Sequence, residues 1–192
     1  MSLSHRPRPL TVFEGLQETH PKTLVLKEKV LSLTGNSFHV RSTDGQPVLR
    51  VKGKTMSFSG RRSVYDMANR HLFDICKKHL HIRTTFAAET PQARKLLEVK
   101  SGFSLIGCKA TATITTSSGQ SRILTLKGNW LDRAEIVEKD SGAVMARIER
   151  KFLNENEILF GKQTYTVTVA PGVDIAVIAA ICICFDDKNK AN

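Results

Sequence analysis

The chain contains 192 residues, of which 41% are hydrophobic, and its formal net charge is +11 at pH 7. This length and apolar content exclude a wholly disordered chain and indicate one globular domain, or at most two small ones. The excess of basic residues favours anionic partners, namely phospholipid headgroups, nucleic acid or acidic proteins, although it also suits a surface that only keeps the protein soluble.

The cysteines and the chain ends bear on the location of the protein. Cys76, Cys108, Cys182 and Cys184 form no CxxC pair and lack the spacing of a zinc site. Residues 1–9 are polar and rich in proline, so we expect them to be disordered and not to act as a signal peptide. Position 2 is not glycine, and the last residues contain no prenylation box. These features predict an intracellular, cytoplasmic protein, with or without peripheral attachment to a membrane.

From Leu10 onward the chain is predicted to form short strands separated by turns. Apolar and polar residues alternate, and turn signals recur about every 8–12 residues, which is typical of a barrel or a sandwich. The segment 93–100 is compatible with a short helical turn, but its place in the series favours a strand. The predicted strands are residues 23–33, 37–42, 47–54, 63–67, 71–77, 80–86, 93–100, 104–116, 121–127, 134–139, 143–152 and 165–169.

The last segment is buried on all sides. Residues 165–169 alternate as a strand before Pro171-Gly172 interrupts them, and every residue from 175 to 185 is apolar or a cysteine. The β-branched residues favour a strand, whereas the Pro-Gly break and Asp174 as a cap favour a helix, which we predict over 174–185. A membrane span needs about 20 apolar residues, so a tail anchor is the less favoured alternative.

Two pairs of similar segments indicate an internal repeat. Residues 40–54 resemble residues 114–129, and residues 75–81 resemble residues 148–154. Two sheet-forming halves of this kind can close around one another. A sheet of about a dozen strands has no open edges if it closes into a barrel, and a barrel wider than about eight strands leaves a lumen. We therefore predict a strand barrel with a hydrophobic helix threaded through it.

The same residues resemble a known family, the LURP-one-related proteins. That family's C-terminal signature is similar to Tyr165, Val167, Val169, Pro171, Gly172, Val173, Asp174 and Ala176, followed by an apolar run and Asp186-Asp187. Its N-terminal half is similar to Phe38, Val40, Asp44, Gln46, residues 51–54, Arg61, Arg62 and Asp66. The likeness covers residues 10–187, which we take as one domain, and leaves 188–192 as a tail.

The resemblance implies a mainly β fold, a twelve-stranded antiparallel barrel around a central C-terminal helix. This fold is shared with the tubby C-terminal domain and with the phospholipid scramblases. Tubby domains bind phosphoinositide headgroups through basic residues, which cannot be matched to single positions here. The cysteine cluster and the acidic calcium segment of the scramblases are missing from this chain, which argues against calcium-driven scrambling.

We expect no enzymatic activity, no cofactor and no metal. The chain contains no glycine-rich phosphate loop and no nucleophile elbow. His79 and His81 share a strand face near Cys76, but no acidic or thiolate partner completes a metal site. On a helix, Cys182 and Cys184 diverge and become core thiols.

Basic residues form the candidate binding site, and they fall into three groups along the chain. The candidates for contact with lipid headgroups are Lys52, Lys54, Arg61 and Arg62 in the first group, Lys77, Lys78 and Arg83 in the second, and Arg147, Arg150 and Lys151 in the third. Groups of this kind attract phosphates of membranes or of nucleic acids. Aromatic residues make up only 6% of the chain, which disfavours single-stranded nucleic acid because its bases stack on aromatic rings.

Three functions follow from these observations. The first is a non-enzymatic, tubby-like protein that binds anionic phospholipid surfaces, including phosphoinositides, or acts as a regulatory adaptor for other proteins. The second is a regulatory protein associated with nucleic acid, which only the charge suggests. The third is a scramblase-like protein that handles lipids without a transmembrane span.

Overall fold

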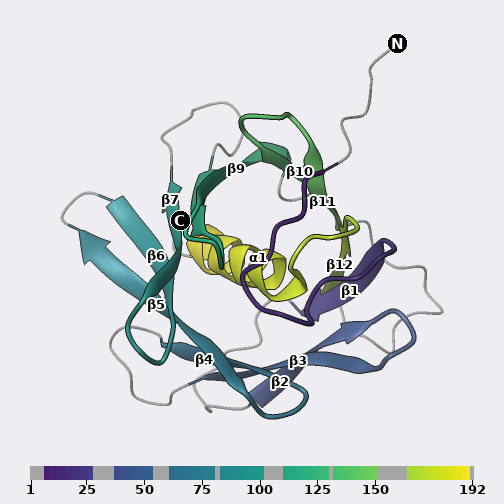
Figure 1. Ribbon diagram of the computed structural model, residues 1–192, viewed down its shortest axis with the longest axis horizontal. Coiled ribbons are helices and arrows are strands. Elements are labelled where there is room, and N and C mark those ends of the chain that lie inside the picture. Colours follow the sequence, from purple (N-terminus) through teal and green to yellow (C-terminus); the bar gives the residue numbers. More distant parts are fainter. Residues whose placement is uncertain are drawn as a thin grey trace.

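The computed structural model describes residues 7–27, 37–53, 61–80, 83–101, 110–129, 132–150 and 164–190. Within them, the strands are β1 (Lys22–Lys27), β2 (Ser37–Ser42), β3 (Pro47–Gly53), β4 (Arg62–Asp66), β5 (His71–Leu80), β6 (Arg83–Glu89), β7 (Lys95–Ser101), β8 (Ala110–Thr115), β9 (Ser121–Gly128), β10 (Arg133–Glu138), β11 (Val144–Glu149) and β12 (Thr164–Val169), and the helix is α1 (Ile175–Lys190). Neighbouring strands pair antiparallel, and β1 closes the ring by pairing with both β2 and β12 (Figure 1). The predicted antiparallel barrel around a C-terminal helix is confirmed.

The alternation of side chains along each strand separates a core face from an outer face. In β8, Ala110, Ala112 and Ile114 are at most 1% exposed, while the threonines between them are half-buried. Ala112 lies opposite Leu124 of β9, which is also buried, because residues opposite each other on paired strands share a face. The inner faces of the strands therefore form one apolar lining.

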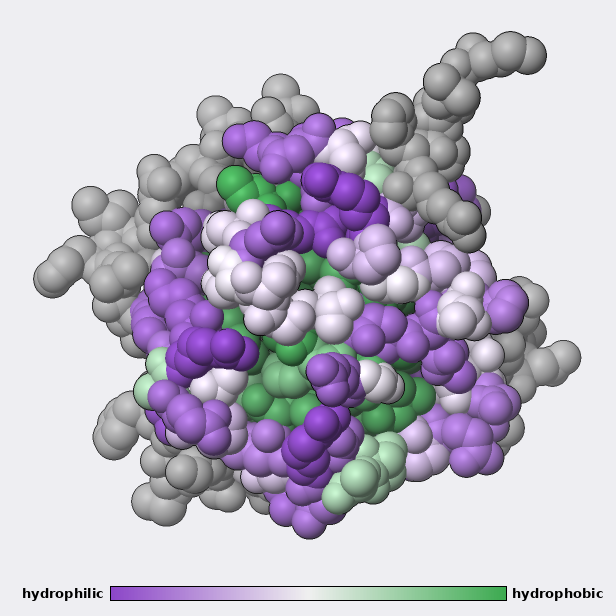
Figure 2. All heavy atoms as spheres, in the orientation of Figure 1, coloured by the Kyte–Doolittle hydropathy of each residue, from purple (hydrophilic) through white to green (hydrophobic). Residues whose placement is uncertain are grey.

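The helix fills the space inside this lining. No residue from Ile175 to Phe185 is more than 6% exposed, and α1 crosses the middle of the ring of strands (Figure 1). At one end of the barrel, the larger hydrophobic patches lie towards the middle and hydrophilic residues surround them (Figure 2). Ile and Val are poor helix formers, but burial on every side outweighs this propensity. The helix predicted over 174–185 is confirmed, and it continues to Lys190.

The strand boundaries differ from the prediction around the β5–β6 hairpin. The sequence predicts strands at 71–77 and 80–86, whereas β5 continues to Leu80, which pairs with Arg83 of β6. The polar run of Lys77, Lys78 and His79 resembles a turn, but in the barrel these residues pair with β6. The predicted strand at 93–100 is β7, and Ala93, with a φ of 61°, belongs to the preceding turn.

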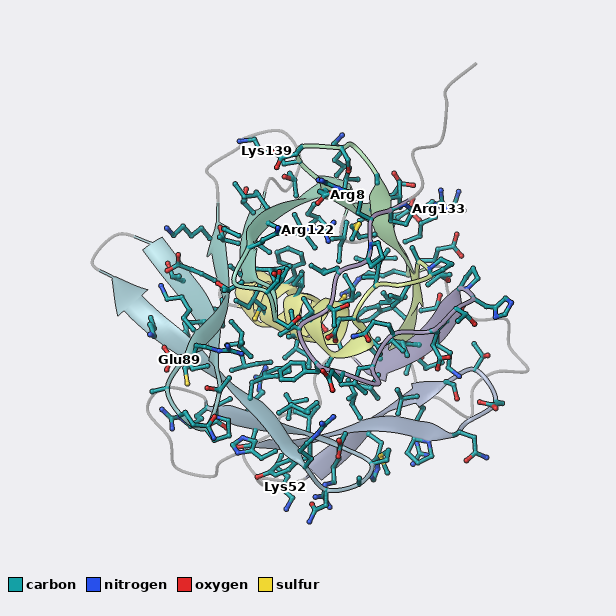
Figure 3. The ribbon with its side chains drawn as sticks, in the orientation of Figure 1. Arg8, Lys52, Glu89, Arg122, Arg133 and Lys139 are labelled. Carbon is teal, nitrogen blue, oxygen red and sulfur yellow. The ribbon has the colours of Figure 1, made fainter. Side chains whose placement is uncertain are left out.

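The segment before β1 covers one end of the barrel beside the start of α1. Leu10 is fully buried and forms a β-bridge with Val173, and Gln17 forms another with Asp174. The sequence predicts disorder for residues 1–9, yet the carbonyls of Arg8 and Pro9 accept hydrogen bonds from Arg122 (Figure 3). Residues 1–6 lie outside the described part of the chain.

The two repeated segments lie in hairpins six strands apart. Residues 40–54 begin in β2 and continue through β3, and residues 114–129 begin in β8 and continue through β9. Their turns have the same bonds: the N–H groups of Ser42 and Thr116 donate to the carbonyls of Gln46 and Gln120, both at 2.9 Å. The glycines in these turns have φ values of 83° and 81°, which only glycine adopts freely. These matching turns lie at corresponding places in the two predicted halves of the barrel, and the relation between the halves stays a prediction.

None of the helical residues that the structure describes form a stretch long and apolar enough to span a membrane. The segment weighed as a tail anchor is α1, which lies buried inside the barrel.

Candidate functional site

The ten basic candidates do not lie together on one surface. Lys54 and Lys151 lie outside the described residues, and Arg83 begins β6 without a described side chain. In the third group, Arg147 is exposed and pairs with Glu135 at 3.1 Å. In the second group, Lys78 pairs with Glu89, and Lys77 lies opposite the buried Phe86 and is half-buried. These placements leave Lys52 and Arg61 of the first group as the core of a candidate site.

The outer side of β3, β4 and β5 presents a cluster of cations around one aromatic ring. Lys52 extends outward from β3 (Figure 3), and its Nζ lies 5.1 Å from the centre of the Tyr65 ring. Arg50 lies directly opposite Tyr65 on the neighbouring strand, with its Cζ 5.2 Å from the same centre. His71 of β5 stacks on the ring at a centroid distance of 4.8 Å. We call the outer surface formed by Arg50, Lys52, Arg61, Tyr65 and His71 the Tyr65 face.

A single carboxylate organises the edge of the Tyr65 face. Asp74 Oδ1 accepts a hydrogen bond from Ser63 Oγ at 2.6 Å and lies 3.0 Å from His71 Nε2. Arg61 pairs with Asp74 Oδ2 at 3.5 Å, while its own side chain stays 43% exposed. Asp74 therefore holds Arg61 and His71 in place at the edge of the face.

The β4–β5 turn continues the Tyr65 face towards the end of the barrel. The side chain of Asp66 accepts hydrogen bonds from the backbone N–H of Arg70 at 2.8 Å and from its Nε at 2.9 Å. Arg50 donates a hydrogen bond to Asn69 Oδ1, so β3 and the turn are tied together. Arg70 is exposed, which adds another cation beside the face.

Arg62 and Arg150 are placed on the inner side of the barrel. Arg62 lies opposite the buried Ile75 of β5, and Arg150 follows the buried Ile148 by two residues. The side chain of Arg150 is 7% exposed and pairs with Asp186 of α1. We leave both arginines out of the candidate surface, because Arg62 lies on the inner face of β4 and Arg150 belongs to a buried ion pair.

The C-terminal half of α1 is held by a buried polar cluster around Asp186. Tyr165 donates a hydrogen bond to Asp186 Oδ2 at 2.7 Å, and the Cζ of Arg150 lies 4.1 Å from the centre of the Tyr165 ring. Burial and the neighbouring Asp186 carboxylate raise the pKa of Tyr165 well above its usual range. The phenol therefore stays neutral and donates to the carboxylate.

A second buried ion pair anchors the N-terminal segment at the other end. Arg122 Nε donates to Glu138 Oε1 at 2.6 Å, and its NH1 group donates to the carbonyl of Pro9 at 2.6 Å. Burial alone would raise the pKa of Glu138, but hydrogen bonds from Ser141 and Arg122 outweigh it and lower the pKa. This pair is structural, since Glu138 is only 1% exposed.

The Tyr65 face offers charge and an aromatic surface rather than reactive groups. The described residues contain no cluster of His, Cys, Asp or Glu that could hold a metal ion. Arg50, Tyr65 and His71 were not among the sequence candidates, although Arg50 shares a strand face with Lys52. The register that brings Tyr65 opposite Arg50 could not be derived from sequence, because the length of the β3–β4 connection does not define it.

Comparisons with known proteins agree with this architecture. The LURP-one-related family model matches residues 22–186. The chain is 25% identical to "Protein LURP-one-related 15" of Arabidopsis thaliana, over 89% of this chain and 82% of that protein. It is 26% identical to "Protein LURP-one-related 10" of the same plant, over 89% of this chain and 92% of that protein.

A solved structure shows the same fold. The X-ray structure of an Arabidopsis thaliana protein aligns with a TM-score of 0.67 at 21% sequence identity, and the alignment covers 95% of this chain and 99% of that one. Because the family model matches most of the chain and carries the strands and the helix that form the barrel, the protein belongs to the LURP-one-related family.

Proposed function

We propose that this protein binds anionic phospholipid surfaces through the Tyr65 face, on the cytoplasmic side of a membrane and without enzymatic chemistry. The observation that carries the proposal is the charge of this surface. Arg50, Lys52 and Arg61 of the face and Arg70 beside it outnumber the two carboxylates that pair with them, Asp66 and Asp74, and Glu14 lies nearby on the N-terminal segment. An excess of cations on one surface attracts anionic membranes, at about 1 kcal/mol for each Lys or Arg close to the lipid.

Several exposed cations elsewhere on the described part of the barrel lie beside glutamates. Lys95 and Lys100 both contact Glu98, at 3.3 and 3.1 Å, and Arg133 lies 3.8 Å from Glu149. Lys52, in contrast, rests on the Tyr65 ring. A cation on an aromatic ring keeps its full charge and is held in position at little cost, so it is ready to meet a phosphate.

The aromatic residue of this face supports a membrane more than a nucleic acid. Single-stranded binders offer open aromatic rings on which bases stack. The Tyr65 ring is instead covered by Arg50, Lys52 and His71. Phosphate groups can still be bound by the surrounding cations, which is the chemistry that a lipid headgroup requires.

The test compares two double variants that remove equal charge. Arg50→Gln/Lys52→Gln removes two cations from the Tyr65 face, and Arg133→Gln/Arg147→Gln removes two from exposed positions on β10 and β11. In flotation with phosphatidylserine vesicles, the first should weaken binding by about tenfold or more, and the control should bind like the wild type. Higher salt should weaken wild-type binding, because the attraction between exposed charges is screened. Both variants should melt close to the wild-type temperature, since Lys52, Arg133 and Arg147 are exposed and the half-buried Arg50 loses one hydrogen bond, to Asn69.

Vesicles that carry phosphoinositide or phosphatidylserine at the same total charge separate headgroup recognition from simple surface attraction. Equal binding to the two kinds of vesicle would mean that the protein responds to surface charge and does not recognise a particular headgroup. Wild-type behaviour of Arg50→Gln/Lys52→Gln would show that the face is not the site, and absence of vesicle binding would favour an adaptor for proteins. Stronger binding to duplex DNA at matched salt would favour a nucleic-acid role, and lipid flipping across vesicles would favour scramblase-like handling.

A further inference from the structure

The tip of the β4–β5 turn exposes an apolar side chain. Met67 is 47% exposed, and no other large hydrophobic side chain in the described ranges is exposed. Single exposed apolar residues are common on protein surfaces, so exposure alone has little meaning. The position of Met67 matters more, because the turn extends directly from the Tyr65 face.

The turn holds Met67 in a fixed position. The N–H of Asp66 donates to the carbonyl of Arg70, and the N–H of Asn69 donates to the carbonyl of Asp66, both at 3.1 Å. Asn69 has a φ of 67°, a conformation that asparagine tolerates better than most residues. The N–H of Arg70 also donates to the Asp66 side chain, and Arg50 donates to Asn69 Oδ1, so hydrogen bonds close the turn on both sides of its tip.

Two arginines, Arg70 and Arg50, lie beside the turn that carries Met67. Arg70 is 56% exposed and Arg50 reaches the turn through Asn69. The neighbouring carboxylate, Asp66, is already paired with Arg70. The exposed Glu14 also belongs to this region, since Arg70 donates to its carbonyl at 3.4 Å. An apolar tip beside cations matches the layered chemistry of a membrane, in which the acyl chains lie just below the phosphates.

We propose that Met67 enters the apolar layer of an anionic phospholipid membrane while the surrounding cations contact the headgroups. This inference rests on the proposed function and adds the element that penetrates the bilayer. A methionine suits the role because its flexible, polarisable side chain adapts to irregular apolar surroundings. The attachment would then combine an electrostatic part, which salt weakens, with a small hydrophobic part, which salt does not weaken.

The first measurement is the affinity of Met67 variants for vesicles of phosphatidylserine and phosphatidylcholine. Met67→Ser should weaken binding by about three- to tenfold. The reason is that about half of a methionine side chain would no longer move from water into an apolar layer. Met67→Leu should restore wild-type affinity. The loss caused by Met67→Ser should persist at high salt, unlike the loss caused by Arg50→Gln/Lys52→Gln.

The second measurement locates the side chain by fluorescence. Met67→Trp should be quenched by lipids with brominated acyl chains, and Ser118→Trp, at the exposed β8–β9 turn, serves as the control. Quenching of Met67→Trp above that of the wild type and of the control would support insertion. If Met67→Ser binds vesicles with wild-type affinity and Met67→Trp is not quenched, the insertion of Met67 is overturned. If Arg50→Gln/Lys52→Gln still weakens vesicle binding in that case, the proposed function stands without the insertion. If the wild type does not bind the vesicles, both proposals fail.

Discussion

The carboxylate of Asp174 connects the N-terminal segment to the start of the helix. Oδ1 accepts hydrogen bonds from the N–H groups of Ala176 and Val177, at 2.9 and 3.2 Å, which confirms the predicted cap. Oδ2 accepts from the N–H groups of Val12 and Phe13, at 3.1 and 2.7 Å. The cap was visible in the sequence, but the bonds to Val12 and Phe13 join residues far apart in the chain and were not.

Protonation of Asp174 should change stability in a direction opposite to that of most carboxylates. Burial raises the pKa of Asp174 to about 6, although the N–H donors of Phe13 and Val12 oppose this shift. The folded state therefore keeps the proton at a higher pH than the unfolded state. The cost of the charged form is fully present above the folded pKa and disappears as the pH falls towards the unfolded pKa, about 4.

The quantity to compare is the free energy of unfolding of the wild type minus that of Asp174→Asn. This difference should rise by up to about 3 kcal/mol as the pH is lowered from 7 to 4. Urea titrations of both proteins at several pH values give this difference, and the variant cancels the contributions of other titrating groups. A difference that falls towards acid would show that the pKa of Asp174 is depressed instead.

The ion pair of Arg150 and Asp186 should behave as a buried pair. Arg150→Leu leaves the Asp186 carboxylate in the core with a weaker set of partners, which should cost about 3–5 kcal/mol. The double variant Arg150→Leu/Asp186→Leu should recover much of this loss, since no uncompensated charge remains. Thermal or urea unfolding of the two single variants and the double variant completes the cycle. Additive losses would argue against direct coupling.

At the scale of the elements, α1 is shielded by the whole barrel. Cys182 and Cys184 are both fully buried, and burial, followed by the nearby Asp186 carboxylate, raises the pKa of Cys182 well above its usual range. A neutral thiol without access to solvent does not react. Neither cysteine should be labelled by a bulky maleimide in the native protein, whereas both should be labelled in denaturant. Mass spectrometry of the digested protein reports each site, and rapid native labelling would mean that α1 leaves the barrel.

The acidic end of α1 is explained by the strands that surround it. A carboxylate near the C-terminal end of a helix is unfavourable, because that end carries partial negative charge. Arg150, which directly follows β11, pairs with Asp186 and supplies the opposite charge. The alternation of strand positions could have shown that Arg150 faces inward. Arg150 lies two residues after the buried Ile148, and residues two apart in a strand share a face. Proximity along the chain alone groups Arg150 with surface cations, whereas its strand position turns it inward.

At the scale of the whole molecule, the alternation of apolar and polar residues was sufficient to predict the barrel but not to predict the binding surface. Alternating residues and turn signals indicate a series of short strands, and the fully apolar segment required an enclosed space. The Tyr65 face depends instead on the register between β3, β4 and β5, which places Arg50 opposite Tyr65 and Tyr65 opposite His71. Registers between strands follow from tertiary packing, so the site could only be found in the structure.

The pairing of β1 with β12 also affects how the protein must be made. Lys22 lies opposite Val169, so the ring cannot close until the ribosome has synthesised both strands. Until then, the inner faces of the earlier strands lack the apolar helix that covers them, because α1 follows β12. Such distant pairing slows folding and leaves apolar strands exposed to aggregation during synthesis. A nascent chain of this protein is therefore expected to depend on chaperones until its last segment emerges.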